Sequence, residues 1–168
     1  TAVGAAALDL NTTSSNNTAV GYNALTTNTG GNNTGIGYKA LEANTSGADN
    51  TAVGTGALVA NTTASYNTAV GKDALNDNTT GANNVSVGYN ALASCTTGEG
   101  NTAIGSLAGD ALTTASNNTV VGNNALTSNN PVGCTVMGHD AAEGVGGDYN
   151  VAIGYEAMKA SATGTGNC

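Results

Sequence analysis

The hydrophobic and polar positions of this chain repeat every 16 or 17 residues, around a glycine that recurs ten times. The unit reads roughly Asn-Thr-Ala-Val-Gly-x-x-Ala-Leu-x-x-Asn-Thr-x-Gly-x-x. In each unit, Thr or Val stands two residues before an apolar residue, with a small residue between them in most units. Because strand side chains alternate between two faces, this spacing predicts a short β-strand in each repeat, for example over residues 18–20, 51–53 and 68–70. The glycines are Gly4, Gly21, Gly37, Gly54, Gly71, Gly88, Gly105, Gly122, Gly138 and Gly154.

Two sets of apolar positions are candidates for the core. The residue before each glycine is always apolar, and an Ala follows three residues after each glycine, with Leu next to it in most units. We expect the Val column and the Ala-Leu pairs to form facing walls of a narrow interior, with the strand Thr column pointing inward beside the Val column. The predicted core residues are Val20, Val53, Val70, Ala24, Ala57, Ala74, Leu25, Leu58 and Leu75.

Asparagine forms two further columns. One stands directly before the strand, and the other begins an Asn-Thr pair such as Asn28-Thr29 or Asn44-Thr45. Identical Asn side chains stacked at about 4.7 Å can hydrogen-bond along the stack. We therefore predict Asn ladders at the corners of the coil, the first formed by Asn17, Asn33, Asn50, Asn67, Asn84, Asn101 and Asn118.

The repeat pattern decides the fold class. A helical repeat would need apolar spacing near 3.6 residues, and an antiparallel meander would be expected to contain Asn-Gly or Asp-Gly turns, which the sequence lacks. We predict an all-β parallel β-solenoid of ten turns, with one 16–17-residue repeat per turn. Residues 1–168 form a single domain, less regular from about residue 105 onward. Ten turns at about 4.8 Å give a rod roughly 45–50 Å long.

The repeats resemble a known family. Asn150-Val151-Ala152-Ile153-Gly154-Tyr155-Glu156-Ala157 and Asn101-Thr102-Ala103-Ile104-Gly105-Ser106-Leu107-Ala108 are similar to the head repeats of YadA-like trimeric autotransporter adhesins. Similar Thr-Ala-Val-Gly arrays occur in fibre proteins of phages and marine bacteria. The resemblance implies a left-handed parallel β-roll that is often a homotrimer and is exposed at a cell or virion surface. The unit here is a few residues longer, and Thr often replaces the first Val of the motif.

Charge and hydropathy exclude several classes of partner. The net charge is −8, and the only basic residues are Lys39, Lys72 and Lys159. Nucleic-acid binding needs clustered Lys and Arg, and so does attraction to an anionic membrane surface. No apolar run reaches the length of a transmembrane helix. We expect neither nucleic-acid binding nor membrane insertion.

The residues that carry enzyme chemistry are few. His139 is the only histidine, and no nucleophile is tied by pattern to it or to Asp140. The cysteines Cys95, Cys134 and Cys168 lie far apart in the sequence, and the aspartates fall in different columns of the repeat. A tetrahedral metal site or a repeated calcium site is therefore not expected. We predict a protein that is not an enzyme and has no cofactor.

The repeat architecture predicts a structural subunit or segment of an extracellular fibre or filament, at a cell surface or on a virion. The rod would assemble by self-association, either end to end through Thr1, Asn167 and Cys168 or as a homotrimer. The alternative is an adhesin or phage tail-fibre head that binds a glycan or receptor through Tyr22, Tyr38, Tyr89 and Tyr155, which follow the repeat glycine. Ice binding by Thr ladders is set aside, because the strand Thr column is expected to face inward and no outward Thr-x-Thr pair recurs.

Overall fold

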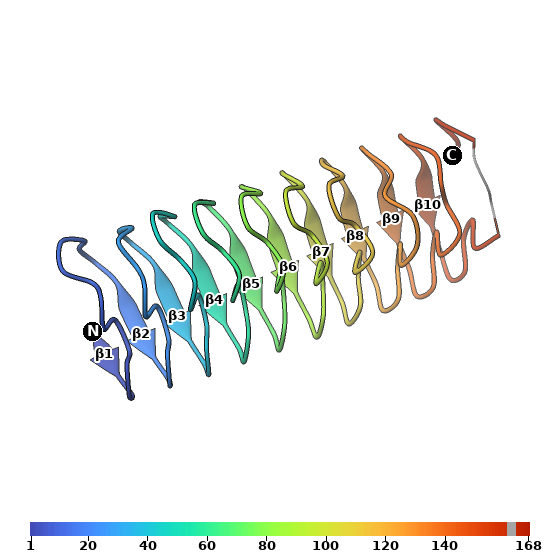
Figure 1. The fold of residues 1–168 in the computed structure, drawn as a ribbon. Coiled ribbons are helices and arrows are strands. Elements are labelled where there is room, and N and C mark those ends of the chain that lie inside the picture. The colour runs from blue at the N-terminus through green and yellow to red at the C-terminus, as the bar shows by residue number, and fades with distance from the viewer. Residues whose placement is uncertain (161–163) are drawn as a thin grey trace.

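The computed structural model describes residues 1–160 and 164–168. The chain winds into a β-solenoid whose ten strands form one parallel sheet in sequence order. Figure 1 shows one strand per turn, with the two termini at opposite ends of the rod. Coils 1 to 10 denote here the turns that begin with the correspondingly numbered strands. The strands are β1 (Ala2–Val3), β2 (Thr18–Val20), β3 (Thr34–Ile36), β4 (Thr51–Val53), β5 (Thr68–Val70), β6 (Val85–Val87), β7 (Thr102–Ile104), β8 (Thr119–Val121), β9 (Thr135–Met137) and β10 (Val151–Ile153).

Every strand pairs with the next at the same position of the repeat. Thr51 lies beside Thr68, and Val53 lies beside Val70. All the other pairs of neighbouring strands have the same register. The register persists where the repeat shortens from 17 to 16 residues, between β2 and β3, between β8 and β9 and between β9 and β10. The predicted parallel solenoid with one repeat per turn is therefore confirmed, and like residues form continuous columns.

The predicted inward orientation of the Val column is wrong. In each strand from β2 to β10 the middle residue is buried, and its two neighbours are half-buried or exposed. Ala69 is 0% exposed, whereas Val70 is 37% exposed. Val20 and Val53 are half-buried. The strand Thr column shares the Val side and also faces outward.

The width of the coil explains this orientation. Leu25 reaches across the interior so far that a Cβ placed on Gly35, an inner strand position, would lie 3.2 Å from its Cγ atom. The inner side of most strands therefore accepts only a small residue, and the larger Val or Ile is directed outward.

The opposite wall is buried as predicted. Ala24, Ala57, Ala74, Leu25, Leu58 and Leu75 are all 0% exposed. Consecutive residues of an extended strand cannot both point inward. Here the Leu residues adopt a left-handed backbone, with φ of 52° at Leu25, Leu58 and Leu75. This conformation turns the chain so that Ala and Leu both enter the core.

The repeat glycine is required by close contact between coils. Gly71 has φ of 137°, and a Cβ at this position would lie 2.3 Å from the carbonyl oxygen of Gly88 in the next coil. No other residue fits such a backbone and such a contact. The glycine column therefore lets the coils stack where the chain leaves the strand.

Two coils lose the core Leu and replace it from elsewhere in the same coil. Gly109 stands at the Leu position of coil 7, and the side chain of Leu112 occupies that space, 3.2 Å from where a Gly109 Cβ would be. In coil 9, Ala142 stands at the same position and Val145 is buried nearby. The substitutions after residue 105 are therefore compensated within each coil.

Candidate functional site

One continuous surface feature is the outer side of the ten-stranded sheet, which we call the strand face. It consists of Val3 of β1 and the first and third residues of β2 to β10, a column that is mostly Thr beside an aliphatic column. It contains no charged residue. The most exposed aliphatic members are Val3, Ile36, Val70, Ile104, Met137 and Ile153.

The strand Thr side chains differ from the corner Thr side chains. Five corner hydroxyls donate to a carbonyl oxygen of the next coil at 2.8–3.1 Å, those of Thr29, Thr45, Thr62, Thr79 and Thr96. Within the part of the chain that the structure describes, the strand Thr hydroxyls donate to no protein group. The strand face therefore presents free hydroxyls beside aliphatic side chains.

Charged side chains lie in the turns and corners outside the strand face. Lys39 pairs with Glu42 at 3.0 Å, and Lys72 pairs with Asp73, both in the turns that follow the repeat glycine. The chain carries a net charge of −8, but contact between two copies through the uncharged strand face would not bring carboxylates of this face together.

The predicted Tyr row borders the strand face. Tyr22 and Tyr38 are about half exposed, and their rings stack on each other at 5.7 Å with an interplanar angle of 12°. Tyr155 stacks in the same way on His139, at 5.6 Å. The Lys72 Nζ atom lies 5.4 Å from the ring centre of Tyr89. Neighbouring coils thus cover part of these ring faces, and glycan binding by this row stays a prediction.

The first Asn ladder is buried, and its bonds differ from simple amide stacking. Asn17 and the six later members are at most 5% exposed. The Oδ1 atom of Asn50 accepts from the backbone N–H of Asn67, and the Asn50 Nδ2 atom donates to the carbonyl of Ala64. The ladder therefore connects backbone to side chain from coil to coil and satisfies corner carbonyls.

The second Asn column forms the amide-to-amide ladder. Nδ2 of Asn44 donates to Oδ1 of Asn28, Asn61 to Asn44, and Asn78 to Asn61. Cys95 follows in this column and cannot continue the pattern, because its thiol donates to Gly98 instead. Oδ1 of Asn78 is consequently buried without a partner.

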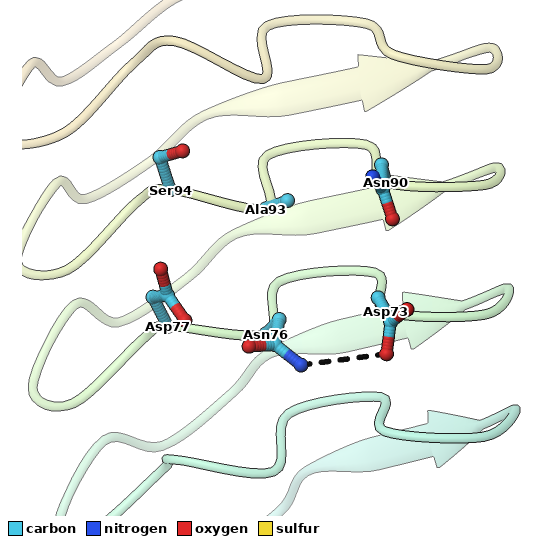
Figure 2. A pocket seen from close by; sticks show the side chains of 6 residues that line it. All are labelled: Asp73, Asn76, Asp77, Asn90, Ala93 and Ser94. Atoms are coloured by element: carbon cyan, nitrogen blue, oxygen red, sulfur yellow. Dashed lines mark hydrogen bonds between the residues drawn. The ribbon is translucent and has the colours of Figure 1, made fainter.

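A shallow hollow of about 320 Å³ lies between coils 5 and 6 (Figure 2). It is lined by Asp73, Asn76, Asp77, Asn90, Ala93 and Ser94. Asn76 and Asp73 interact at 3.5 Å, the edge of hydrogen-bonding distance. Only two carboxylates contribute to this hollow. In residues 1–160 and 164–168 there is no group of three or more His, Cys, Asp or Glu side chains placed to hold a metal.

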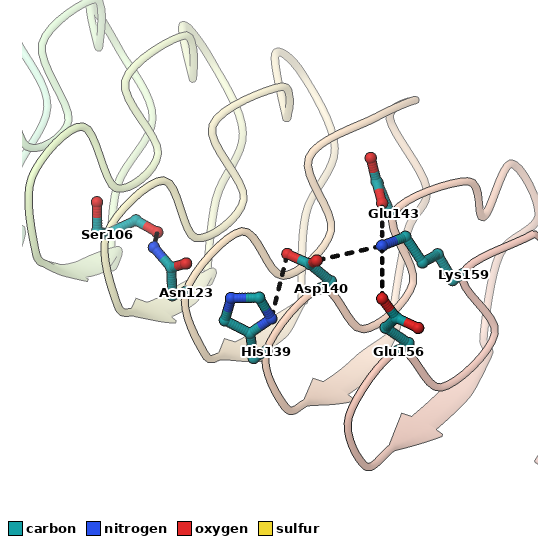
Figure 3. A network of polar contacts seen from close by, with 7 residues as sticks. All are labelled: Ser106, Asn123, His139, Asp140, Glu143, Glu156 and Lys159. Atoms are coloured by element: carbon teal, nitrogen blue, oxygen red, sulfur yellow. Dashed lines mark hydrogen bonds and ion pairs between the residues drawn. The ribbon is translucent and has the colours of Figure 1, made fainter.

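The predicted His139–Asp140 pair belongs to a surface ion network in the last coils (Figure 3). Nδ1 of His139 lies 3.4 Å from Asp140, and Lys159 lies 3.2 Å from Asp140, 3.4 Å from Glu143 and 2.9 Å from Glu156. The hydrogen bonds that Lys159 donates to Glu156 and Asp140 raise the pKa of Lys159. The network joins coils 9 and 10 and presents no nucleophile to His139.

The remaining predicted positions lie as follows. Cys95 and Cys134 are buried free thiols, and Cys168 is an exposed one. Asn167 continues the first ladder, since its backbone N–H donates to Oδ1 of Asn150 at 2.9 Å. The nitrogen of Thr1 donates to the carbonyl of Asn17. Over the described ranges, the chain has no helix that is both apolar and long enough to cross a membrane.

Comparison with known proteins gives no match. No protein-family model matches the chain, and no curated protein or solved structure is similar enough to count as a match.

Proposed function

We propose that this protein is a rigid rod segment of an extracellular fibre and that copies associate side by side through the strand face. The observation that carries the proposal is the uncharged strip of Thr and aliphatic side chains, which runs from β1 to β10. End-to-end stacking of rods is a second arrangement that fits the same function.

Stiffness of the rod supports a structural role. Strand pairing joins every coil to the next, and the first Asn column joins nearly all of them. The second Asn column and the corner Thr hydroxyls add bonds between coils 2 and 7. In a solenoid, stability is approximately the sum of such nearest-neighbour contacts. A repeat whose strand pairing and first Asn column recur at almost every step suits a part whose task is length and rigidity.

The size of the strand face supports a partner of the same kind. A strip about 45 Å long and about 10 Å wide covers roughly 450 Å² on each copy. Exposed apolar patches of that size on soluble proteins often mark interaction sites. With the bordering Tyr row, two copies would bury on the order of 1,000 Å², where specific interfaces begin.

The test places charge on the strand face. A triple variant, Val53→Asp, Val70→Asp and Val87→Asp, adds three carboxylates to neighbouring coils of this face. The matched control adds three to exposed corner positions, as Thr63→Asp, Thr80→Asp and Thr97→Asp. Light scattering after gel filtration, and negative-stain electron microscopy, measure the assembly of each protein.

We expect wild type and the corner variant to assemble and the face variant to remain a single rod, with unchanged circular dichroism in all three. Equal assembly of the face variant and wild type would contradict lateral association. Filaments of single-rod width from both triple variants would favour end-to-end stacking instead.

A second candidate function is ice binding, which the outward Thr column favours. The sequence-based reason for setting it aside, an inward Thr column, is wrong. Thr hydroxyls and aliphatic methyl groups recur at one strand spacing of about 4.8 Å along the rod, a regular array that can order water. The absence of an outward Thr-x-Thr pair still counts against it. Ice grown with the wild-type chain would show facets and thermal hysteresis, and rounded crystals without hysteresis would exclude this function.

A further inference from the structure

The chain contains eight Asn-x-Ser/Thr triplets, the acceptor pattern for N-linked glycans. A sequence rich in Asn and Thr produces such triplets readily, so the pattern alone does not decide which Asn is usable. The triplets begin at Asn11, Asn16, Asn32, Asn44, Asn61, Asn78, Asn84 and Asn117.

Four of these Asn side chains are inaccessible in the folded chain. Asn44, Asn61, Asn78 and Asn84 are 0% exposed. Their amide nitrogens donate within the core, for example from Asn84 to the carbonyl of Gly98 at 2.8 Å. Asn11 is half-buried, and its amide nitrogen donates to the carbonyl of Ser14. A transferase cannot reach the four buried amides without unfolding the coil.

Three others share one exposed column. Asn16, Asn32 and Asn117 stand at the corner before the strand, are exposed, and have left-handed backbones with φ between 60° and 63°. In each, the middle residue of the triplet is a buried member of the first ladder, which holds the corner in place.

The Thr of each exposed triplet is also at least partly accessible, since Thr119 is exposed and Thr18 and Thr34 are half-buried. Thr18, Thr34 and Thr119 begin β2, β3 and β8 on the outward side of the sheet. Within the described ranges, their hydroxyls donate no hydrogen bond to another protein group. An enzyme that recognises both Asn and Thr therefore finds both side chains of the triplet on the surface.

We propose that the corner Asn16/Asn32 pair and Asn117 are acceptor sites for N-linked glycans on the folded rod. The biological setting rests on the proposed extracellular location.

The donor is an oligosaccharide on a polyprenyl diphosphate, and an oligosaccharyltransferase supplies the base. The Asn Nδ2 atom bonds to C1 of the sugar and gives one proton to the base. The C1–O bond breaks, and the lipid diphosphate leaves with the electron pair.

The geometry limits the number of glycans. Nδ2 of Asn16 donates to Oδ1 of Asn32 at 3.0 Å, and the two residues lie on adjacent coils. Coils are about 4.8 Å apart, less than the width of a sugar chain, so a glycan on one Asn blocks the other. Asn117 lies five coils beyond Asn32 and has no such neighbour. We expect at most two glycans on this exposed column.

The chain provides its own control in the same column. Asn83 is exposed and has φ of 60°, as the acceptors have, but Val85 stands where they have Thr. Val85→Thr installs the residue that most coils carry at this position. The variant should fold normally and gain a site at Asn83, which lies three coils from Asn32 and two coils from Asn117.

The experiment treats the purified folded chain with an oligosaccharyltransferase and its lipid-linked oligosaccharide. The same reaction on urea-unfolded chain, diluted to a concentration that the enzyme tolerates, is the control for access. Intact mass gives the number of glycans, and peptide mapping after enzymatic release gives their positions.

We expect one glycan shared between Asn16 and Asn32, one at Asn117, and a third at Asn83 in the Val85→Thr variant. The buried triplets should be modified only in the unfolded chain. The proposal would be overturned if the folded chain stayed unmodified. It would also be overturned if Asn44 and Asn61 were modified in the folded chain as fully as Asn16, Asn32 and Asn117. Fibre assembly is measured separately, on the unmodified chain. A chain that assembles but is not glycosylated would contradict only the glycan sites, and a chain that is glycosylated but does not assemble would contradict only the proposed function.

Discussion

Oδ1 of Asn61 accepts a 2.9 Å hydrogen bond from Nδ2 of Asn78, whereas Oδ1 of Asn78 accepts none. Both side chains are 0% exposed and occupy the same position in adjacent coils. The difference arises because Cys95, in the following coil, has no amide to donate. Two chemically identical residues thus have different hydrogen-bond partners.

This difference predicts unequal costs for the same substitution. Asn61→Ala leaves Oδ1 of Asn44 without its donor and Nδ2 of Asn78 without one of its acceptors. Asn78→Ala leaves only Oδ1 of Asn61 unpaired and removes an atom that had no partner. We expect Asn61→Ala to lower the free energy of unfolding by about 1–2 kcal/mol more than Asn78→Ala. Urea denaturation measures both, and equal costs would contradict the role of the ladder.

The orientation of the strand predicts opposite outcomes for two adjacent positions. Ala69 is 0% exposed, and Val70 is 37% exposed on the strand face. Ala69→Asp places an unpaired carboxylate in the core and should destabilise the rod by several kcal/mol. Val70→Asp should change stability by less than about 1 kcal/mol. Thermal unfolding followed by circular dichroism checks both variants, and the reverse order would mean that the Val column faces inward.

Coil 7 predicts a compensating pair. Gly109→Leu alone forces a side chain into space that Leu112 and Leu92 already occupy. Leu112→Asn alone leaves a cavity in the core. Each should cost about 2 kcal/mol or more, but the double variant restores the Leu and Asn arrangement of the other coils. A double-mutant cycle should give about 2 kcal/mol of favourable coupling, and additive costs would contradict the exchange.

Asp110 predicts a dependence of stability on pH. Burial raises the pKa of this carboxyl, and its Oδ1 atom has no partner. The folded chain therefore binds the proton more tightly than the unfolded chain. The contribution of Asp110 to stability is therefore greatest below the pKa that its carboxyl has in the unfolded chain. This contribution is lost as the pH rises through the higher pKa of the folded chain. Asp110→Asn should raise the Tm at pH 7 and leave it nearly unchanged at pH 3.

The control for this prediction is Asp77→Asn, which removes the same charge from an exposed position. Its Tm should change less than that of Asp110→Asn at pH 7. If both variants gain the same Tm, the effect comes from net charge and not from the burial of Asp110.

Much of the candidate site was visible in the sequence as columns, but its orientation was not. The alternation of Thr, Ala and Val indicated a strand with two faces, and the pattern was compatible with either face inside. We expected the Val face inward because Val is the more apolar residue. The structure places Ala inside, because the left-handed Leu of the opposite wall already fills the coil.

The sequence by itself determined the solenoid, the length of each coil and the columns of like residues, because a repeat of constant period stacks identical positions on one another. Only the tertiary structure decided which side of the sheet meets solvent, how far Leu112 replaces the Leu missing at Gly109, and which Asn residues are accessible. These features depend on the distance between the opposite walls of one coil. The residues that set this distance are neighbours in space, and the period of the repeat does not specify how far apart they lie.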